Sequence, residues 1–378
     1  MDPYTKTHNE LRKIFDPKLK EISIPGSKIK IQNLEFISDF PFNGFSNSSD
    51  TLISENFTFT YPVFVPEDKE TGKVILLLHG LNERSWEKYL TWAFYLTTIT
   101  GSYVILFPIS FHINRSPASW KDPRSMIQSL QKRISLLGKI DKSSFANVAL
   151  SERLTDDPLR FFSSGYQTSC DIIKLMLSIK DNKHPVIRSL STLNIFAYSI
   201  GAFLAEILVL GNPNELFSGS KLFIFCGGSV FSNMKGTSKL IMDKVAFDRV
   251  YNYYMNDFEN TIKDKSPLSN FLNYNQTGLV FRSMIDLGRL RLFRENLFRK
   301  LRGQIHSITL SKDTVIPSDG IRATLSDWDK SMQSVTDIVD FPYQYTHENP
   351  FPVLEIPLSL EVDKSFEKVF SAAGSFLI

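Results

Sequence analysis

The sequence has few of the residues from which disulfide scaffolds and zinc clusters are built. Only two of its 378 residues are cysteines, Cys170 and Cys226, and six are histidines. Disulfide-rich domains need several cysteine pairs, and structural zinc sites mostly use closely spaced cysteines. The sequence also lacks the G-x-x-x-x-G-K-[ST] phosphate loop and the H-E-x-x-H zinc motif. It therefore excludes a disulfide scaffold, and we expect neither a metal nor a cofactor.

Neither sign of charge predominates. The chain has 43 lysines and arginines against 40 aspartates and glutamates, which gives a net charge of +3. Proteins that bind nucleic acids usually carry a clear excess of basic residues on one face. We therefore expect no nucleic-acid partner. The composition leaves the oligomeric state open.

No apolar run is long and uniform enough to cross a membrane. Residues 89–114 carry no charged side chain and residues 193–211 carry only Glu206, but the first stretch is broken by Gly-Ser and Pro and the second by Ser-Ile-Gly. A spanning helix needs about 20 consecutive apolar residues. The N-terminal stretch is polar and does not resemble a secretory signal. We expect no membrane contact and a cytoplasmic protein.

Phenylalanine is the residue that the sequence has in abundance. It occurs 31 times in a chain that is otherwise ordinary, with 42% hydrophobic and 22% charged residues. Several of these rings fall in one segment, residues 229–287: Phe231, Phe247, Phe258, Phe271 and Phe281.

Short apolar runs bounded by turn residues recur along the chain. Such runs are typical of strands in a parallel sheet that helices cover on both faces. Segments with helical periodicity lie between them, and this alternation predicts the α/β class. The expected strands are residues 28–36, 56–65, 73–78, 103–107, 193–198, 221–226, 304–310 and 335–341, and the expected helices are residues 86–98, 161–178, 201–210, 290–301 and 365–373.

Two stretches break this alternation. We interpret residues 111–157 and 229–287 as insertions at strand ends, the second of them a cap. Residues 1–55 are expected to be an N-terminal lead-in to a main domain of residues 56–378. In sheets of this class ligands bind outside the carboxyl ends of the strands, so the chemistry is expected there.

Ser199 directly follows the strand predicted at residues 193–198. It is the centre of an Ala-Tyr-Ser-Ile-Gly pentapeptide at residues 197–201. This resembles the G-x-S-x-G nucleophile elbow of the α/β-hydrolase fold, with alanine in place of the first glycine. A serine at such a tight turn projects its hydroxyl into the crevice, and small neighbours let strand and helix pack closely. The alternative is an ordinary serine at a helix N-terminus.

The resemblance implies a histidine base and an acid, in the chain order serine, acid, histidine. Only His306 and His347 follow Ser199. His306 lies inside the strand predicted at residues 304–310, whereas His347 lies in the loop after residues 335–341, where the family has its histidine. We therefore expect His347 to activate the serine. The alternative is a histidine of a surface loop.

Asp313 is the expected acid. It follows the seventh strand in a turn that ends in proline and resembles the acid turn of the family. It would accept a hydrogen bond from His347 Nδ1 and hold the ring in the required tautomer. Asp319 is a nearby alternative, and Asp243 or Asp248, after the sixth strand, would be a rarer placement.

The resemblance also implies two backbone N–H groups that bind the oxyanion. One belongs to the residue after the nucleophile and one to the loop after the third strand of the family, which here are Ile200 and Leu81. A His79-Gly80 pair closes that strand. We expect Gly80 to leave room for the substrate carbonyl and His79 to order the loop.

The resemblance to the α/β-hydrolase superfamily covers about residues 56–360. It implies a serine hydrolase that forms an acyl-enzyme with a small-molecule ester or related acyl substrate. The aromatic cap favours an apolar substrate, and an ester over an amide or peptide. We expect Gly80, Tyr198 and Phe231 to contact this substrate. The alternative is an inactive protein of this fold that binds a ligand or a partner.

Three further features have a structural interpretation beside a functional one. Cys226 ends an apolar strand without a nearby histidine, and we expect a buried residue. Arg115 and Trp120, in the first insertion, are candidates for the pocket wall. Basic residues around the helix at 290–301 could attract a membrane, but we interpret them as the solvated face of a helix that packs on the sheet: Arg289, Arg291, Arg294, Arg299, Lys300 and Arg302.

Overall fold

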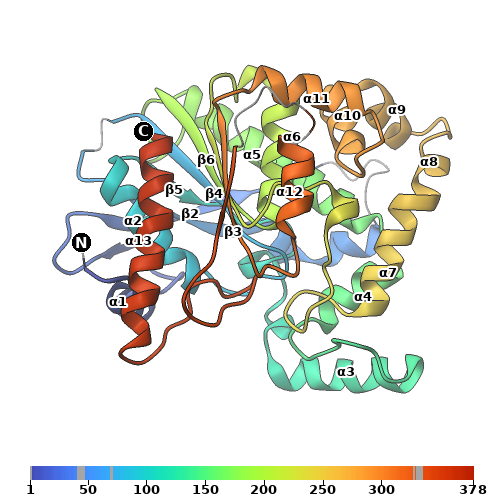
Figure 1. Ribbon diagram of the computed structural model, residues 1–378, viewed down its shortest axis with the longest axis horizontal. Coiled ribbons are helices and arrows are strands. Elements are labelled where there is room, and N and C mark those ends of the chain that lie inside the picture. The colour runs from blue at the N-terminus through green and yellow to red at the C-terminus, as the bar shows by residue number, and fades with distance from the viewer. Residues whose placement is uncertain (1, 41–46, 69–70, 327, 329–334) are drawn as a thin grey trace.

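A computed structural model describes residues 2–40, 47–68, 71–326, 328 and 335–378 (Figure 1). Its strands form one sheet in the order β1-β2-β3-β5-β4-β6-β7-β8-β9. The strands are β1 (Glu21–Ser23), β2 (Lys30–Ile37), β3 (Thr58–Val65), β4 (Lys73–Leu78), β5 (Tyr103–Leu106), β6 (Thr192–Tyr198), β7 (Leu222–Phe225), β8 (Ile305–Leu310) and β9 (Thr336–Val339).

The α-helices of the described residues lie on both faces of this sheet and in the insertions. They are α1 (Tyr4–Ile14), α2 (Glu87–Thr100), α3 (Pro123–Leu137), α4 (Val148–Asp156), α5 (Arg160–Lys180), α6 (Ile200–Gly211), α7 (Lys244–Asn252), α8 (Phe258–Thr261), α9 (Pro267–Tyr274), α10 (Gln276–Ser283), α11 (Arg291–Lys300), α12 (Ser318–Leu325) and α13 (Leu358–Leu377).

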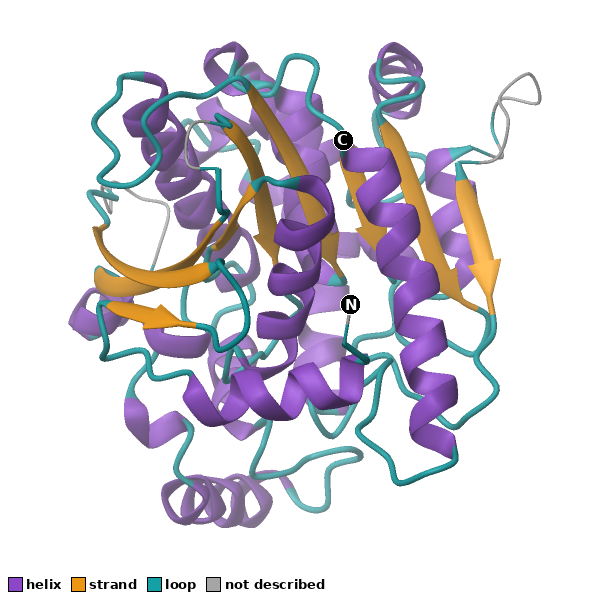
Figure 2. Ribbon diagram, turned by 90° about the vertical axis from the view of Figure 1, so that its left-hand side faces the viewer, coloured by secondary structure: helices purple, strands orange, loops and turns teal. Residues whose placement is uncertain are grey.

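The pleat of the central strands separates two hydrophobic layers. On β4, Ile75 and Leu77 face a cluster formed with α1, α2 and α13, whereas Leu76 and Leu78 face a cluster formed with α5 and α6. Figure 1 shows α1 and α13 on one side of the sheet, and Figure 2 looks onto that side. The predicted class, a mostly parallel sheet with helices on both faces, is confirmed.

The order of the strands places the crevice. From β5 to β9 all neighbouring strands are parallel, and β4 lies between β5 and β6. The chain thus leaves β4 towards one edge of the sheet and leaves β6 towards the other. Ligands of open parallel sheets bind at such a reversal, outside the carboxyl ends of the strands. Residues after β4 and β6 therefore meet at one site.

The N-terminal residues contribute to the same sheet. β2 pairs antiparallel with β3 from Lys30 to Ile37, β1 extends the edge beyond β2, and α1 packs against α2 and α13. The sequence pattern predicts the strand at residues 28–36 but neither α1 nor β1. α1 has charged and polar residues over most of its length and buries only Tyr4, Thr7 and Leu11, which is a weak pattern.

The two insertions supply helices rather than strands. Residues 111–157 contain α3 and α4, and residues 229–287 contain α7 to α10. α4 packs on α7, and α10 packs on both α6 and α9. The second insertion therefore covers α6, the helix that follows Ser199. The domain boundaries given above, and the name cap for residues 229–287, stay predictions.

Helix α11 corrects one expectation. Its basic residues were expected to form a solvated face, but Arg294 is buried and its guanidinium donates to the carbonyl oxygens of Ser283, Asp286 and Leu287 at 2.6, 3.0 and 2.7 Å. The charge is tolerated because these carbonyls satisfy it. A sequence pattern cannot distinguish such an arginine from a solvated one.

Among the described residues, no helix has both the length and the apolar composition that a membrane span requires.

His184 is a titratable group buried within the fold. It is 5% exposed, its Nδ1 accepts the N–H of Ile187 at 2.9 Å, and its Nε2 lies 2.9 Å from the Tyr61 hydroxyl. Burial lowers the pKa of His184 to about 4. Burial likewise lowers the pKa of His112 to about 4. Both rings are therefore neutral in the folded protein at pH 7.

We predict that the free energy of unfolding decreases as the pH falls from about 6.5 to about 4. In this range the unfolded chain binds protons that the folded chain excludes, which costs about 1.4 kcal/mol per pH unit for each such histidine. Urea unfolding at a series of pH values measures the slope. His184→Gln should flatten it, and the matched change His306→Gln, at a partly exposed histidine of β8, should not. An unchanged slope in His184→Gln would contradict the prediction.

Candidate active site

Ser199 occupies a strained turn between β6 and α6. Its φ and ψ angles are 57° and −126°, a conformation that residues with a side chain rarely adopt. A Cβ atom on Gly201 would lie 2.6 Å from the carbonyl oxygen of Leu78 and 2.7 Å from that of His79. Glycine is therefore required for α6 to approach the end of β4 this closely. Ala197 is fully buried under the turn.

The Ser199 hydroxyl contacts a histidine rather than the helix. Ser199 is the residue before α6, but its side chain makes no capping hydrogen bond. Its Oγ lies 2.6 Å from His347 Nε2, and His347 Nδ1 lies 2.7 Å from Asp313 Oδ2. Ser199, His347 and Asp313 are 4%, 4% and 6% exposed. The structure thus brings together the three residues singled out in the sequence.

These contacts define the tautomer of the histidine. A carboxylate only accepts hydrogen bonds, so Nδ1 carries the ring proton and donates a hydrogen bond to Asp313. Nε2 is then free to accept the Ser199 O–H. The other carboxylate oxygen of Asp313 accepts the backbone N–H groups of Val315 and Ile316 at 2.8 and 2.9 Å. These two bonds orient the carboxylate, so that Oδ2 points at the ring.

The alternative acids have other roles. Asp319 is exposed on α12. Asp243 accepts the N–H of Ala246 at the start of α7 and pairs with Arg133 at 2.8 Å. Asp248 pairs with Lys244 on the surface of α7.

The alternative histidine is likewise engaged elsewhere. His306 lies on β8, where it contacts Asp337 at 3.1 Å and stacks on Phe223. Of the two histidines that follow Ser199, His347 is the one in contact with it.

Tyr198 supports His347 rather than a substrate. Its hydroxyl donates to the backbone carbonyl of His347, and the two rings stack with centroids 5.6 Å apart. Lys88 Nζ lies 4.6 Å from the centre of the Tyr198 ring and donates to the carbonyl of Glu348 at 3.0 Å. Strand alternation puts Tyr198 on the side of α2 and α13, away from the apolar cavity. The expected substrate contact of Tyr198 is therefore not seen.

His79 and Gly80 order the loop after β4. His79 Nδ1 donates to the carbonyl of Gly80 at 2.8 Å, and its Nε2 accepts the N–H of Ile109 at 2.9 Å. Burial lowers the pKa of His79 well below its usual value, so the ring is neutral. The N–H of Gly80 donates to the Tyr89 hydroxyl at 3.0 Å, and a Cβ on Gly80 would lie 3.1 Å from the Tyr198 ring. Gly80 thus makes room for the Tyr198 ring, and its expected contact with a substrate stays a prediction.

The amides of Leu81 and Ile200 have no hydrogen-bond acceptor within the part of the chain that the structure describes. Ile200 is the first residue of α6, where no helical carbonyl can accept its N–H. Both residues line the same cavity.

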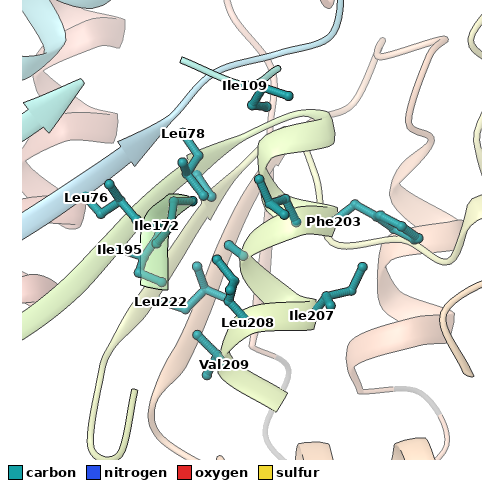
Figure 3. Close-up of a cluster of buried hydrophobic side chains, with 14 of the residues drawn as sticks. Leu76, Leu78, Ile109, Ile172, Ile195, Phe203, Ile207, Leu208, Val209 and Leu222 are labelled. Atoms are coloured by element: carbon teal, nitrogen blue, oxygen red, sulfur yellow. The ribbon is translucent and has the colours of Figure 1, made fainter. Parts of the chain in front are cut away.

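That cavity is mostly apolar, and it borders Ile200, the residue after Ser199. It spans about 610 Å³ of space between atoms, its open mouth included. Phe203 and Ile207 of α6 form one wall, and Figure 3 shows them projecting away from the strand residues. The remaining wall and the far end come from α5, α9 and α10: Phe162, Gly165, Tyr166, Phe271 and Phe281.

Two of the phenylalanines expected in the cap, Phe271 and Phe281, line the cavity. Phe231, an expected substrate contact, does not. Its ring is buried behind Phe161, with centroids 5.2 Å apart, and Phe161 lines the cavity.

The sequence pattern did not reveal His112, which also lines the cavity. Its Nε2 is buried without a partner among the described residues.

The remaining candidates take other places. Cys226 is buried, and burial raises the pKa of its thiol well above the usual value, so it is no nucleophile. Arg115 is buried in an ion pair with Asp171 at 2.8 Å and stacks over Phe59. Trp120 lines a second, smaller pocket. Within the described residues, no group of three or more potential metal ligands is found.

The chain matches one family model and is similar to several solved structures. A model of a family of unknown function, DUF6051, matches residues 40–378. No curated protein matches the sequence. Carboxyl esterase 2 of the mycorrhizal fungus Tuber melanosporum is 10% identical over 100% of both chains, with a TM-score of 0.47. An esterase of Pyrobaculum calidifontis is 10% identical over 99% of this chain and 90% of its own, with a TM-score of 0.44. A peroxisomal α/β-hydrolase of Saccharomyces cerevisiae is 13% identical over 92% and 89%, with a TM-score of 0.40.

The α/β-hydrolase fold of the chain is evident from its own features. The mostly parallel sheet, the reversal at β4 and the strained serine turn between β6 and α6 are all present. The predicted fold class is therefore confirmed.

We predict that Gly201→Ala destabilises the protein by about 1–3 kcal/mol, because its Cβ would overlap two backbone carbonyls that cannot move independently of the sheet. Urea unfolding measures the change. Gly165→Ala is the matched control, since a Cβ on Gly165 in α5 would have no atom within 4 Å. It should be neutral or stabilise by about 0.5–1 kcal/mol. Equal stability of both variants would contradict the tight contact at Gly201.

Proposed function

The chain belongs to the DUF6051 family, whose function is unknown, and we propose that it is a serine hydrolase that cleaves carboxylic esters of small apolar molecules. The observation that carries the proposal is the continuous hydrogen-bonded series Ser199–His347–Asp313 at a strained strand-to-helix turn. Strain of this kind persists where the surrounding structure enforces it, and it is typical of active sites.

The proposed reaction begins with attack by Ser199 Oγ on the ester carbonyl carbon. His347 Nε2 accepts the hydroxyl proton as the C–O bond forms. Asp313 stabilises the resulting imidazolium through Nδ1–H and remains ionised itself. The carbonyl oxygen gains negative charge, and the N–H groups of Leu81 and Ile200 are the donors that would bind it.

The tetrahedral intermediate then collapses to an acyl-enzyme. The bond to the alcohol oxygen breaks, and His347 returns its proton to that oxygen, so a neutral alcohol leaves. A water molecule takes the alcohol's place and gives a proton to His347 as it attacks the acyl carbon. Release of the carboxylic acid returns the proton to Ser199.

The lining of the cavity supports an ester with an apolar group. Phe203, Ile207, Phe271 and Phe281 offer contact area but no hydrogen-bonding group. A peptide chain bound there would find few partners for its N–H and C=O groups, which costs free energy. An ester with a hydrocarbon chain carries no N–H and gains from burial of the chain.

We predict that Ser199→Ala lowers kcat by about 10⁴–10⁶, because the three residues act as a unit. A panel of p-nitrophenyl esters from acetate to decanoate measures the activity. Ser135→Ala, at an exposed serine of α3, is the matched control and should retain full activity. Full activity of folded Ser199→Ala would instead favour a ligand-binding protein without catalysis.

We predict that Gly165→Leu shortens the longest ester chain that the enzyme accepts. A side chain at residue 165 would enter empty space in the cavity. Each excluded methylene forfeits about 0.8 kcal/mol, so the ratio of kcat/KM for octanoate to that for acetate should fall about tenfold or more. Gly165→Ala, which fills little space, should keep a ratio near that of the unchanged protein. A ratio that stays constant in Gly165→Leu would show that the chain binds elsewhere.

A further inference from the structure

A second, smaller pocket adjoins the loop that carries Leu81. It encloses about 410 Å³ of empty space, its mouth included, and its walls come from this loop, from residues 111–121 and from α4. Three basic side chains line it, Arg84, Lys121 and Arg153, against one acidic side chain, Glu83.

Two of these positive charges are not neutralised. Arg153 pairs with Asp50 at 2.9 Å, and Glu83 pairs with Lys88. Arg84 donates to the carbonyl of Trp120 at 2.7 Å, but in the described part of the chain neither Arg84 nor Lys121 contacts a carboxylate.

The nearest acidic neighbour in sequence is also engaged. Asp122 adjoins Lys121, but its carboxylate accepts the N–H and the hydroxyl of Ser125 at 2.9 and 2.7 Å and so caps α3. The side chains that line the pocket therefore carry a net positive charge.

The positive charges of Arg84 and Lys121 repel each other. Arg84 and Lys121 are both partly buried. Burial lowers the pKa of Arg84, and burial together with the charge of Arg84 lowers the pKa of Lys121. An anion between the two side chains would remove the repulsion and replace their lost hydration. Guanidinium groups suit this purpose, since their donors match phosphate and carboxylate oxygens.

The basic pocket and the apolar cavity meet at His112, which lines both. His112 Nδ1 donates to the carbonyl of Ser110 at 2.8 Å, and the low pKa given above keeps the ring neutral. Arg84 is three residues after Leu81, which lines the apolar cavity. The two spaces therefore adjoin, and both border the loop that follows β4.

We propose that Arg84 and Lys121 bind an anionic group of the substrate, at the opposite end from the apolar group that occupies the cavity along α6. The substrate is then an amphiphilic ester with a phosphate or carboxylate at one end. This inference rests on the proposed function and specifies its substrate class.

The test compares three hexanoyl esters that differ in charge. Hexanoyl glycerol is neutral, hexanoyl glycerol 3-phosphate carries a phosphate, and hexanoyl glycolate carries a carboxylate. The unchanged protein should show a kcat/KM at least about tenfold higher for one of the anionic esters than for the neutral one, and the preferred ester identifies the anion. Arg84→Gln and Lys121→Gln should each lower that ratio about tenfold, as expected for loss of a charged hydrogen bond.

Lys180→Gln is the control for net charge. Lys180 is exposed at the last residue of α5, a 21-residue helix whose first residue, Arg160, lines one space together with Arg153, so it lies about 30 Å away from that end. Its variant should keep the ratio of the unchanged protein. Equal kcat/KM for neutral and anionic esters, or an equal loss of the ratio in all three variants, would overturn the proposal.

A binding measurement separates this proposal from the proposed function. Calorimetric titration of Ser199→Ala with inorganic phosphate requires no turnover, and further substitution of Arg84 by Gln should weaken the binding about tenfold. Phosphate binding without hydrolysis of any ester would refute the serine hydrolase but keep the anion site. Hydrolysis of neutral esters without phosphate binding or anionic preference would refute the anion site alone.

Discussion

The close contact between the start of α6 and the end of β4 is the constraint on which the site depends. It requires glycine at residue 201, since any Cβ would overlap the carbonyls of Leu78 and His79. The contact leaves Ser199 in a strained turn and brings the first amide of α6 beside the loop after β4. The proposed nucleophile and oxyanion donors would thus be positioned by packing of the backbone, which moves less than side chains do.

The two sides of the sheet serve this site differently. On the side of α2 and α13, Tyr198 and Lys88 hold the segment that carries His347. On the side of α5 and α6, apolar side chains surround the space that begins at Ile200. Strand alternation creates this division, because adjacent residues of β6 point to opposite faces. Substitutions on one side of the sheet should therefore alter the position of His347, and substitutions on the other side the shape of the cavity.

Much of the fold and the three central residues could be predicted from the sequence. The apolar runs of β4, β6 and β8 identify a parallel sheet, and Ser199, Asp313 and His347 each follow a strand whose carboxyl end faces the crevice. The sequence did not reveal what depends on packing between distant segments. Phe231 was expected at the substrate but lies behind Phe161.

Charges show the same limit of sequence reasoning. The sequence pattern predicts a solvated Arg294 on α11. In the structure its guanidinium donates to backbone carbonyls of the segment before the helix. Arg84 and Lys121 are 37 positions apart, and only the folded loops bring them to one pocket. Composition and periodicity predict the layers of a fold. The contacts of a polar side chain depend on loop geometry, which they do not predict.

The proposed serine hydrolase activity depends on the reactivity of Ser199. The most direct measurement is incubation of the native protein with a fluorophosphonate, followed by mass mapping of its peptides. We expect one modification, at Ser199, that is absent when the protein is first unfolded in urea, because the activated hydroxyl exists only in the folded state. Folded protein that stays unmodified, or that is modified at other serines instead, would contradict the account.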